Sequence, residues 1–264
     1  MVDQESLGIP HSIVGGVRVA PLSRADICSI VADECRRLRA KPRSSWTTRL
    51  LFSTNGQVLS LAARNAEFRD ALLRADLVHA DGQAIVFASR RIPGHSIPER
   101  SATTDLIHDL SRIARAEGLS FFLLGSDEDV NARCAQTLER LYPGLNIAGR
   151  RNGYFDTRQE TEVCEEINRS GADILWVGLG KPREQLFCMR NQSSLHTAWA
   201  ATCGGCFSFV TGDYRRAPHW MQSAGLEWLF RAMTSPTLLW RYATTNPHAA
   251  FLLATKTAAG DFSG

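Results

Sequence analysis

The chain has 264 residues, enough to bury one large domain or one domain with an appendage. Hydrophobic residues make up 44% and charged residues 22%, as in ordinary globular proteins. The net charge of +3 is too small to indicate a nucleic-acid-binding protein. No stretch approaches about 18 uninterrupted apolar residues, so no membrane-spanning helix is predicted. The acidic N-terminal sequence MVDQESLG predicts that there is no signal peptide.

Strand and helix patterns alternate along most of the chain. The predicted elements are, in order, a hairpin (12–19), a helix (23–39), a strand (50–54), a helix (57–73), a strand (77–80), a helix after Gly82, a helix (103–117), a strand (121–125), a helix (128–141), a strand (145–149), a helix (157–169), a strand (173–180), a helix (183–192) and a strand (197–202). Strands such as ILWVGL are apolar without alternation, which indicates burial on both faces and a parallel sheet. Residues 1–212 are therefore predicted to form a doubly wound, mostly parallel, Rossmann-like α/β domain.

Residues 213–264 have a different character and are predicted to form a helical C-terminal appendage, with helices at 218–233 and 236–257. Between residues 214 and 257 the only acid is Glu227, and basic residues alternate with Trp220, Trp228 and Trp240. This composition is typical of a segment at a membrane surface. The alternative is a helical pair that packs on the main domain and uses the tryptophans as core.

Two short motifs favour structural roles. Cys203 and Cys206 form a C-x-x-C sequence, but no second pair of ligands at short spacing accompanies it, so a structural role is favoured over zinc or redox chemistry. The odd number of scattered cysteines, seven, is typical of reduced thiols in a cytoplasm. Asp127 and Asp129 form a D-x-D sequence at the start of a predicted helix, where acidic residues complement the helix dipole. No metal site is predicted.

The stretch LVHADGQAIVFASR places Asp81 between a predicted strand and a predicted helix. An Asp there can cap the helix. It can also be a catalytic base, because the carboxyl ends of strands are where open α/β sheets build their sites. The sequence VGLGKPREQ lacks the third glycine of a dinucleotide fingerprint, which disfavours an oxidoreductase, while its place after a buried strand suits phosphate binding.

Several segments together resemble one protein family. They are STNGQVLSLAARN, ADLVHADG, the PER of 98–100, FLLGS, YPGLNIAGRRNGYF, ADILWVGLGKPREQ, CGGCFSFVTGDYRRAP and GLEWLFR. In this order, over about residues 12–245, they are similar to the WecG/TagA/CpsF family of bacterial glycosyltransferases (glycosyltransferase family 26). The resemblance implies sugar transfer from a nucleotide-sugar, usually a UDP-sugar, to a lipid-linked acceptor at the cytoplasmic face of the membrane. It also implies inversion at the anomeric centre and no metal or other cofactor.

The resemblance also implies roles for individual residues. Asp81 falls on the family's proposed base, followed by Gly82 at the substrate site. Ser53 stands where the family has Thr and, with Asn55, is expected to position substrate, with Thr54 as a weaker stand-in. Arg100 matches a position that contacts the donor phosphates or the acceptor.

Two departures from the family pattern affect the remaining site residues. Glu184-Gln185 inverts the usual order, so either Gln185 takes over the family glutamine's role or Glu184 binds a ribose hydroxyl. Leu238 stands where an arginine is common. The phosphate-binding residues implied by the resemblance are Arg216, Arg231 and Arg241.

The sequence therefore predicts a metal-independent, inverting glycosyltransferase of cell-surface polysaccharide biosynthesis, cytoplasmic and peripheral on the inner face of the plasma membrane. Its expected partners are a UDP-sugar, a polyprenyl-diphosphate-linked saccharide and the membrane surface, without nucleic acid. The donor sugar, among N-acetylmannosamine, its uronic acid and glucose, stays open, as does assembly into a homo-oligomer. The alternative is a non-catalytic membrane-surface module that retains the family fold.

Overall fold

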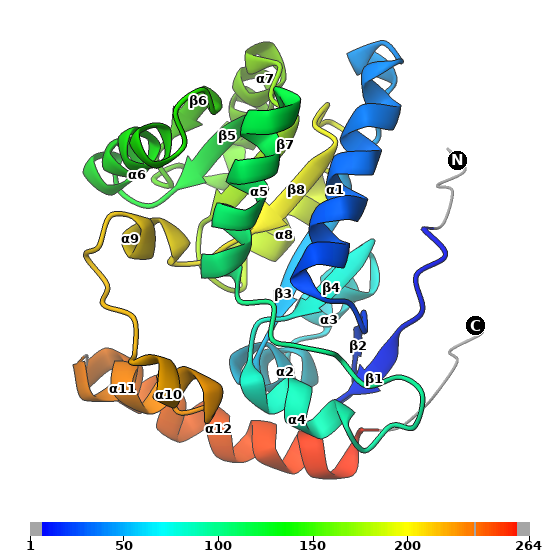
Figure 1. Cartoon of the computed structure of the whole chain (residues 1–264), viewed down its shortest axis with the longest axis vertical. Helices are drawn as coiled ribbons and strands as arrows, with labels where there is room; N and C mark the ends of the chain where they lie inside the picture. The colour runs from blue at the N-terminus through cyan, green and yellow to red at the C-terminus, as the bar shows by residue number, and fades with distance from the viewer. Residues whose placement is uncertain (1–6, 235, 258–264) are drawn as a thin grey trace.

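Six parallel strands form one central sheet in the order β4-β3-β8-β7-β5-β6 (Figure 1). In chain order the strands are β3 (Arg49–Thr54), β4 (Leu77–Ala80), β5 (Ser120–Gly125), β6 (Asn146–Arg151), β7 (Ile174–Gly178) and β8 (Trp199–Thr202). Every residue of these strands is buried except in β6, the edge strand next to β5. The continuous apolar strands thus lie in a parallel sheet, as predicted.

This computed structural model describes residues 7–234 and 236–257. Residues 1–6, 235 and 258–264, which belong to the two predicted domains, lie outside the described residues, and the division into domains stays a prediction. A separate antiparallel hairpin consists of β1 (Ser12–Val14) and β2 (Val17–Val19). It matches the hairpin predicted at 12–19.

Helices cover both faces of the sheet. The helices are α1 (Arg24–Arg39), η1 (Arg43–Ser45), α2 (Gly56–Arg64), α3 (Ala66–Leu73), α4 (Gln83–Ser89), α5 (Thr103–Glu117), α6 (Glu128–Leu141), η2 (Thr157–Gln159), α7 (Glu160–Ser170), α8 (Arg183–Asn191), α9 (Cys206–Val210), α10 (His219–Ser223), α11 (Glu227–Thr234) and α12 (Pro236–Thr255). One core cluster joins the sheet to α2, α3, α7 and α8, and a second joins it to α1, α5, α6 and α9. The doubly wound α/β prediction is confirmed at this level.

Three helical predictions need correction. The helix predicted at 57–73 is two helices, because Asn65 has an extended backbone and its side chain caps α3 by accepting from the Phe68 amide at 3.0 Å. The helix predicted at 218–233 is divided into α10 and α11 around Gly225, whose φ of +74° is left-handed. The short helix α9 was not predicted.

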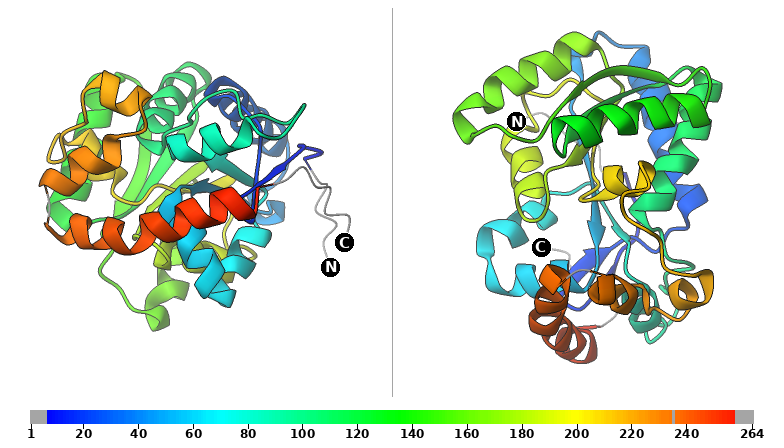
Figure 2. Two further views of the ribbon diagram at one scale, coloured as in Figure 1. Left: turned by 90° about the horizontal axis from the view of Figure 1, so that it is seen from below. Right: turned by 90° about the vertical axis from the view of Figure 1, so that its left-hand side faces the viewer.

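Helices α10–α12 lie across the carboxyl end of the sheet (Figures 1 and 2). Helix α12 packs against α2, where Ala249 and Leu252 are buried, and the amide of Gly16 donates to the Lys256 carbonyl at 2.9 Å. Trp220 and Trp240 are 64% and 75% exposed. The alternative that placed the tryptophans in a core is therefore wrong for these two. Within the described ranges, no helix combines the length and the apolar character needed to cross a membrane.

Candidate active site

A cavity of about 490 Å³ lies at the carboxyl ends of β3, β4 and β8, beside the β7–α8 loop. Residues of α11 and α12, among them Trp228 and Tyr242, line its other side. Its volume is within the usual range for a small-molecule site, and ligands of open α/β sheets bind at this edge. The fold therefore places a candidate active site between the sheet and the C-terminal helices.

The parallel pairing of β3 and β4 brings Asn55 and Asp81 together. Thr54 pairs with Ala80, so the residues that follow the two strands, Asn55 and Asp81, lie next to each other at the carboxyl edge of the sheet. Asn55 donates from Nδ2 to Asp81 Oδ2 at 3.2 Å, while its Oδ1 accepts from the Val58 amide and caps α2. Asn55 therefore has the capping role that its sequence allows and also holds the Asp81 carboxylate.

Asp81 does not cap the helix that follows it. The N-cap of α4 is Gly82, which has no side-chain cap, and Asp81 Oδ1 instead accepts from the backbone amide of Thr103, the first residue of α5, at 3.1 Å. The expectation that Asp81 caps the next helix is thus wrong for α4. Asp81 instead accepts from the first turn of α5, which begins 22 residues after it. A carboxylate accepts about four hydrogen bonds, so Asp81 keeps capacity toward the cavity, which it lines.

The electrostatic surroundings keep Asp81 ionised. Burial by itself raises the pKa of this carboxyl, but the positive charges of Arg100 and Lys181 outweigh it and leave the pKa below its usual value. His79, two residues earlier on β4, is buried, and burial lowers its pKa to about 4. His79 Nδ1 lies 2.8 Å from the Ser101 carbonyl oxygen, so the neutral ring carries its proton on Nδ1. At neutral pH the site therefore holds a carboxylate beside an uncharged imidazole.

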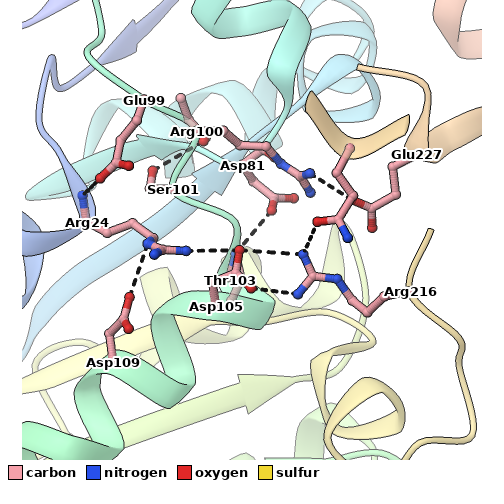
Figure 3. Close-up of polar contacts among 12 residues, drawn as sticks. Arg24, Asp81, Glu99, Arg100, Ser101, Thr103, Asp105, Asp109, Arg216 and Glu227 are labelled. Carbon is pink, nitrogen blue, oxygen red and sulfur yellow. Dashed lines mark hydrogen bonds and ion pairs between the residues drawn. The ribbon is translucent and has the colours of Figure 1, made fainter. Parts of the chain in front are cut away.

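Arg100 lies between the end of β4 and α11. Its Nε donates to the Asp81 carbonyl at 2.6 Å, and its Nη1 lies 2.7 Å from Glu227 Oε2 (Figure 3). Both side chains of this ion pair are mostly buried and line the cavity. Arg100 thus reaches the predicted site, and it also connects the main sheet to the C-terminal helices.

The three C-terminal arginines do not all reach the cavity. Arg231 and Arg241 line it, and the buried Nε of Arg241 has no hydrogen-bond partner among the described residues. Arg216 does not line it, because it pairs with Asp105 at 2.6 Å and donates to Gln222 at 2.7 Å (Figure 3). Two of the three predicted phosphate ligands therefore lie at the cavity, and their role stays a prediction.

Two more predicted residues lie at the cavity. Both Ser53 and its neighbour Thr54 are buried, but only Ser53 lines the cavity, which favours Ser53 of the two hydroxyls. Gly82 also lines the cavity, where a Cβ would lie 3.1 Å from the Asn55 Cβ. A side chain at Gly82 would thus press on the residue that holds Asp81.

Glu184 and Gln185 lie behind the cavity wall, with no exposed area. Glu184 Oε2 accepts from the amides of Gly180 and Gly204, at 3.1 and 3.0 Å, and so joins the β7–α8 loop to the β8–α9 loop. Gln185 donates to Glu184 Oε1 at 3.2 Å. In this structure the pair supports the wall, and its predicted contact with substrate stays a prediction.

Sequence reasoning missed Lys181. Its side chain is 10% exposed and lines the cavity, with Nζ 3.5 Å from Glu184 Oε1. It belongs to the VGLGKPREQ motif, after a buried strand and before α8, where an anion would be expected. Its position in that motif was the available signal.

The remaining motifs have structural roles. Asp127 caps α6 by accepting from the Val130 amide at 2.8 Å, and Asp129 pairs with Arg133. Cys203 and Cys206 are free and buried at the cavity, and burial raises the pKa of both thiols, so they stay protonated. In the part of the chain that the structure describes, no three His, Cys, Asp or Glu side chains are grouped to hold a metal ion.

Residues 12–261, nearly the whole chain, match the model of the glycosyl transferase WecG/TagA/CpsF family. The chain belongs to this family. The match confirms the resemblance seen in the ordered motifs and identifies a glycosyltransferase fold whose substrates are a sugar donor and an acceptor. The cavity at the strand ends is the candidate site for these two substrates.

Proposed function

We propose that the protein transfers a sugar from a UDP-sugar to a polyprenyl-diphosphate-linked saccharide, with inversion, in the assembly of a cell-surface polysaccharide. One observation carries this proposal. An ionised carboxylate, Asp81, is oriented by two hydrogen bonds in a cavity that also contains Lys181, Arg231 and Arg241. A direct displacement of a nucleoside diphosphate by a hydroxyl is assisted by a base that removes the proton and by cations that stabilise the leaving group.

The reaction is a direct displacement at the anomeric carbon. The acceptor hydroxyl attacks that carbon as Asp81 takes its proton, and the bond between the carbon and the diphosphate oxygen breaks. Attack from the face opposite the leaving group inverts the anomeric centre. Asn55 and the Thr103 amide hold the carboxylate in place, so less reorganisation is needed when the proton moves.

The leaving UDP develops negative charge that must be stabilised. The cations that line the cavity, Lys181, Arg231 and Arg241, suit this task, and the unpartnered Nε of Arg241 has a donor to offer. The proposal therefore assigns to side chains the charge that a metal ion supplies in other transferases. N-acetylmannosamine, its uronic acid and glucose are the donor sugars to compare.

The C-terminal helices suit a membrane surface. Trp220, Trp240 and Phe251 are 64%, 75% and 61% exposed, and exposed large apolar side chains are concentrated on α10–α12, as they are on interaction surfaces. We propose that they enter the interface on the inner face of the plasma membrane, where a prenyl-linked acceptor resides. Flotation with anionic vesicles tests this: the double variant Trp220→Ala, Trp240→Ala should bind several-fold less than the Leu73→Ala control, which removes an exposed side chain from α3.

UDP release tests the catalytic proposal. The purified protein is given each UDP-sugar with and without a short-chain prenyl-diphosphate saccharide. Release that requires the acceptor, with a product one sugar heavier by mass spectrometry, supports the proposal and names the donor. Absence of release with every donor, from a protein that still binds vesicles, would support the non-catalytic module instead.

A further inference from the structure

A buried hydroxyl without a protein partner lies beside Asp81. Thr103 is 5% exposed and lines the cavity, and no described residue forms a hydrogen bond with its Oγ1. Its backbone amide donates to Asp81 Oδ1 at 3.1 Å, so the residue is attached to the carboxylate itself (Figure 3). Buried polar atoms of native proteins nearly always have a partner, so this one requires an explanation.

Thr103 differs from some other residues with unpaired hydroxyls because it lines the cavity. Thr54 and Thr202 also have a buried Oγ1 without a partner, but neither lines the cavity. Thr104, the next residue of α5, has an unpaired Oγ1 and does line it. The start of α5 thus places two adjacent threonines in the cavity lining, each with a buried, unpaired hydroxyl oxygen, at a helix end where the N-cap residue, Ala102, supplies no side-chain cap.

A ligand group that binds the Thr103 hydroxyl must be able to hydrogen-bond with a neutral hydroxyl that lies near a carboxylate. A sugar hydroxyl both donates and accepts hydrogen bonds, as a threonine hydroxyl does. Of the cations that line the cavity, Lys181, Arg231 and Arg241 belong to the β7–α8 loop, α11 and α12. Arg100 stands just before α5, but it already pairs with Glu227 and donates to the Asp81 carbonyl. The chemistry of the α5 start therefore fits a saccharide better than the phosphates.

We propose that the Thr103 hydroxyl binds the acceptor sugar at the hydroxyl adjacent to the one that Asp81 deprotonates. The inference rests on the proposed function, because it takes Asp81 as the base. The attacking hydroxyl must contact Asp81, and its neighbour on the sugar ring is the group that can reach the side chain of a residue whose backbone amide binds the same carboxylate. Thr103 is then a specificity-determining residue, since a site built to bind a hydroxyl rejects a substrate that lacks it.

Three variants separate this role from a structural one. Thr103→Val removes the hydroxyl and keeps the shape, Thr103→Ser keeps the hydroxyl, and Thr202→Val removes an unpaired buried hydroxyl that does not face the cavity. We expect Thr103→Val to lower kcat/KM for the acceptor about tenfold, the effect of one neutral hydrogen bond, without changing KM for the UDP-sugar. Thr103→Ser should recover most of this loss, and Thr202→Val should behave as wild type.

A series of monodeoxy acceptors identifies the group that is bound. With wild type, one of them should have a kcat/KM about tenfold below that of the complete acceptor. With Thr103→Val, the two acceptors should have equal kcat/KM. Acceptor binding without donor is measured in parallel from the change in intrinsic fluorescence of the six tryptophans, of which Trp228 lines the cavity. This readout does not depend on turnover.

Four results would overturn the inference. The first is an unchanged acceptor affinity in Thr103→Val, and the second is an equal loss of kcat/KM for the acceptor in Thr202→Val. The third is an effect of Thr103→Val on the UDP-sugar alone, and the fourth is a discrimination among deoxy acceptors that persists in Thr103→Val. Failure of the proposed function is distinguishable, because wild type would then release no UDP in response to any acceptor. Thermal unfolding of each variant identifies a loss that results from misfolding.

Discussion

Replacement of Asp81 by Asn tests the base most directly, because it removes the charge and keeps the shape. The carboxylate accepts from the Thr103 amide at one oxygen and from Asn55 Nδ2 at the other. An amide has only one accepting oxygen, so one of these donors would face an NH2 group. Asn55 cannot turn its own oxygen toward residue 81 without losing its cap on Val58.

The structure limits the effect on stability. A hydrogen bond to a charged acceptor contributes about 1.5–3 kcal/mol, and turning Asn55 instead would remove a helix cap worth about 1 kcal/mol. The variant should therefore lose about 1–3 kcal/mol of unfolding free energy and stay folded at 25 °C. Loss of a general base slows a reaction by about 10²–10⁴-fold, which is about 3–5 kcal/mol of activation free energy. Activity should fall much further than stability.

The assay is acceptor-dependent UDP release between about pH 5 and pH 9, with chemical denaturation of the same samples. Because the pKa of Asp81 is held below its usual value of 3.8, wild type should keep its base ionised across this range and show no loss from this group on the acid side. Asp81→Asn should be slow at every pH. Asp129→Asn is the matched control, because Asp129 is exposed on α6 and its only ion pair among the described residues is with Arg133.

A folded Asp81→Asn protein that keeps more than about a tenth of the wild-type rate would refute this reasoning. Asp81 would then serve only to hold the start of α5. A comparable loss in Asp129→Asn would point instead to a general effect of the removed charge.

Three further expectations concern charge and pH. Lys181→Gln removes a positive charge that lowers the pKa of Asp81, so in a UDP-release profile extended to lower pH the loss of activity due to Asp81 should begin at a higher pH than in wild type; an unchanged profile would show that the two groups are not coupled. His79 has a pKa of about 4 when folded against 6.5 when exposed, so the unfolded state binds more protons between these values and stability should fall by about 3 kcal/mol as the pH drops through them. Urea unfolding measures this fall, which His79→Gln should reduce; an equal fall in that variant would assign it to other groups. Glu227→Gln leaves the mostly buried Arg100 with a neutral partner, so the amides of α11 should exchange hydrogen several-fold faster while those of β5 stay protected, and uniform exchange would contradict a local role for the pair.

Much of the fold was predictable because it depends on local patterns. The apolar period of the strands and the helix signals between them predicted all six sheet strands within a few residues. Asn65 shows the limit of this reasoning, because the apolar period continues through it while its side chain begins a new helix. Periodicity reports which face is buried, and two short helices in sequence can bury the same face.

The candidate site was predictable to the extent that motif residues stand at strand ends. Asp81 follows from that rule and lines the cavity, as do Ser53 and Asn55, which the family resemblance indicated. Glu184 stands in an equally suggestive motif, yet it is buried and holds two loops together. A motif states which residues are near a site, but the direction of each side chain depends on packing.

By itself, the sequence determined the family, the strand and helix order and the presence of an acid at the end of β4, because these are recorded in contiguous residues. Only the tertiary structure decided that Asp81 holds α5 rather than α4, and that Arg100 pairs with Glu227, 127 residues away. It also placed Arg216 outside the cavity and Lys181 within it. The physical reason is that hydrogen bonds and ion pairs depend on distances of a few ångströms, and distant segments acquire those distances only when the chain is packed.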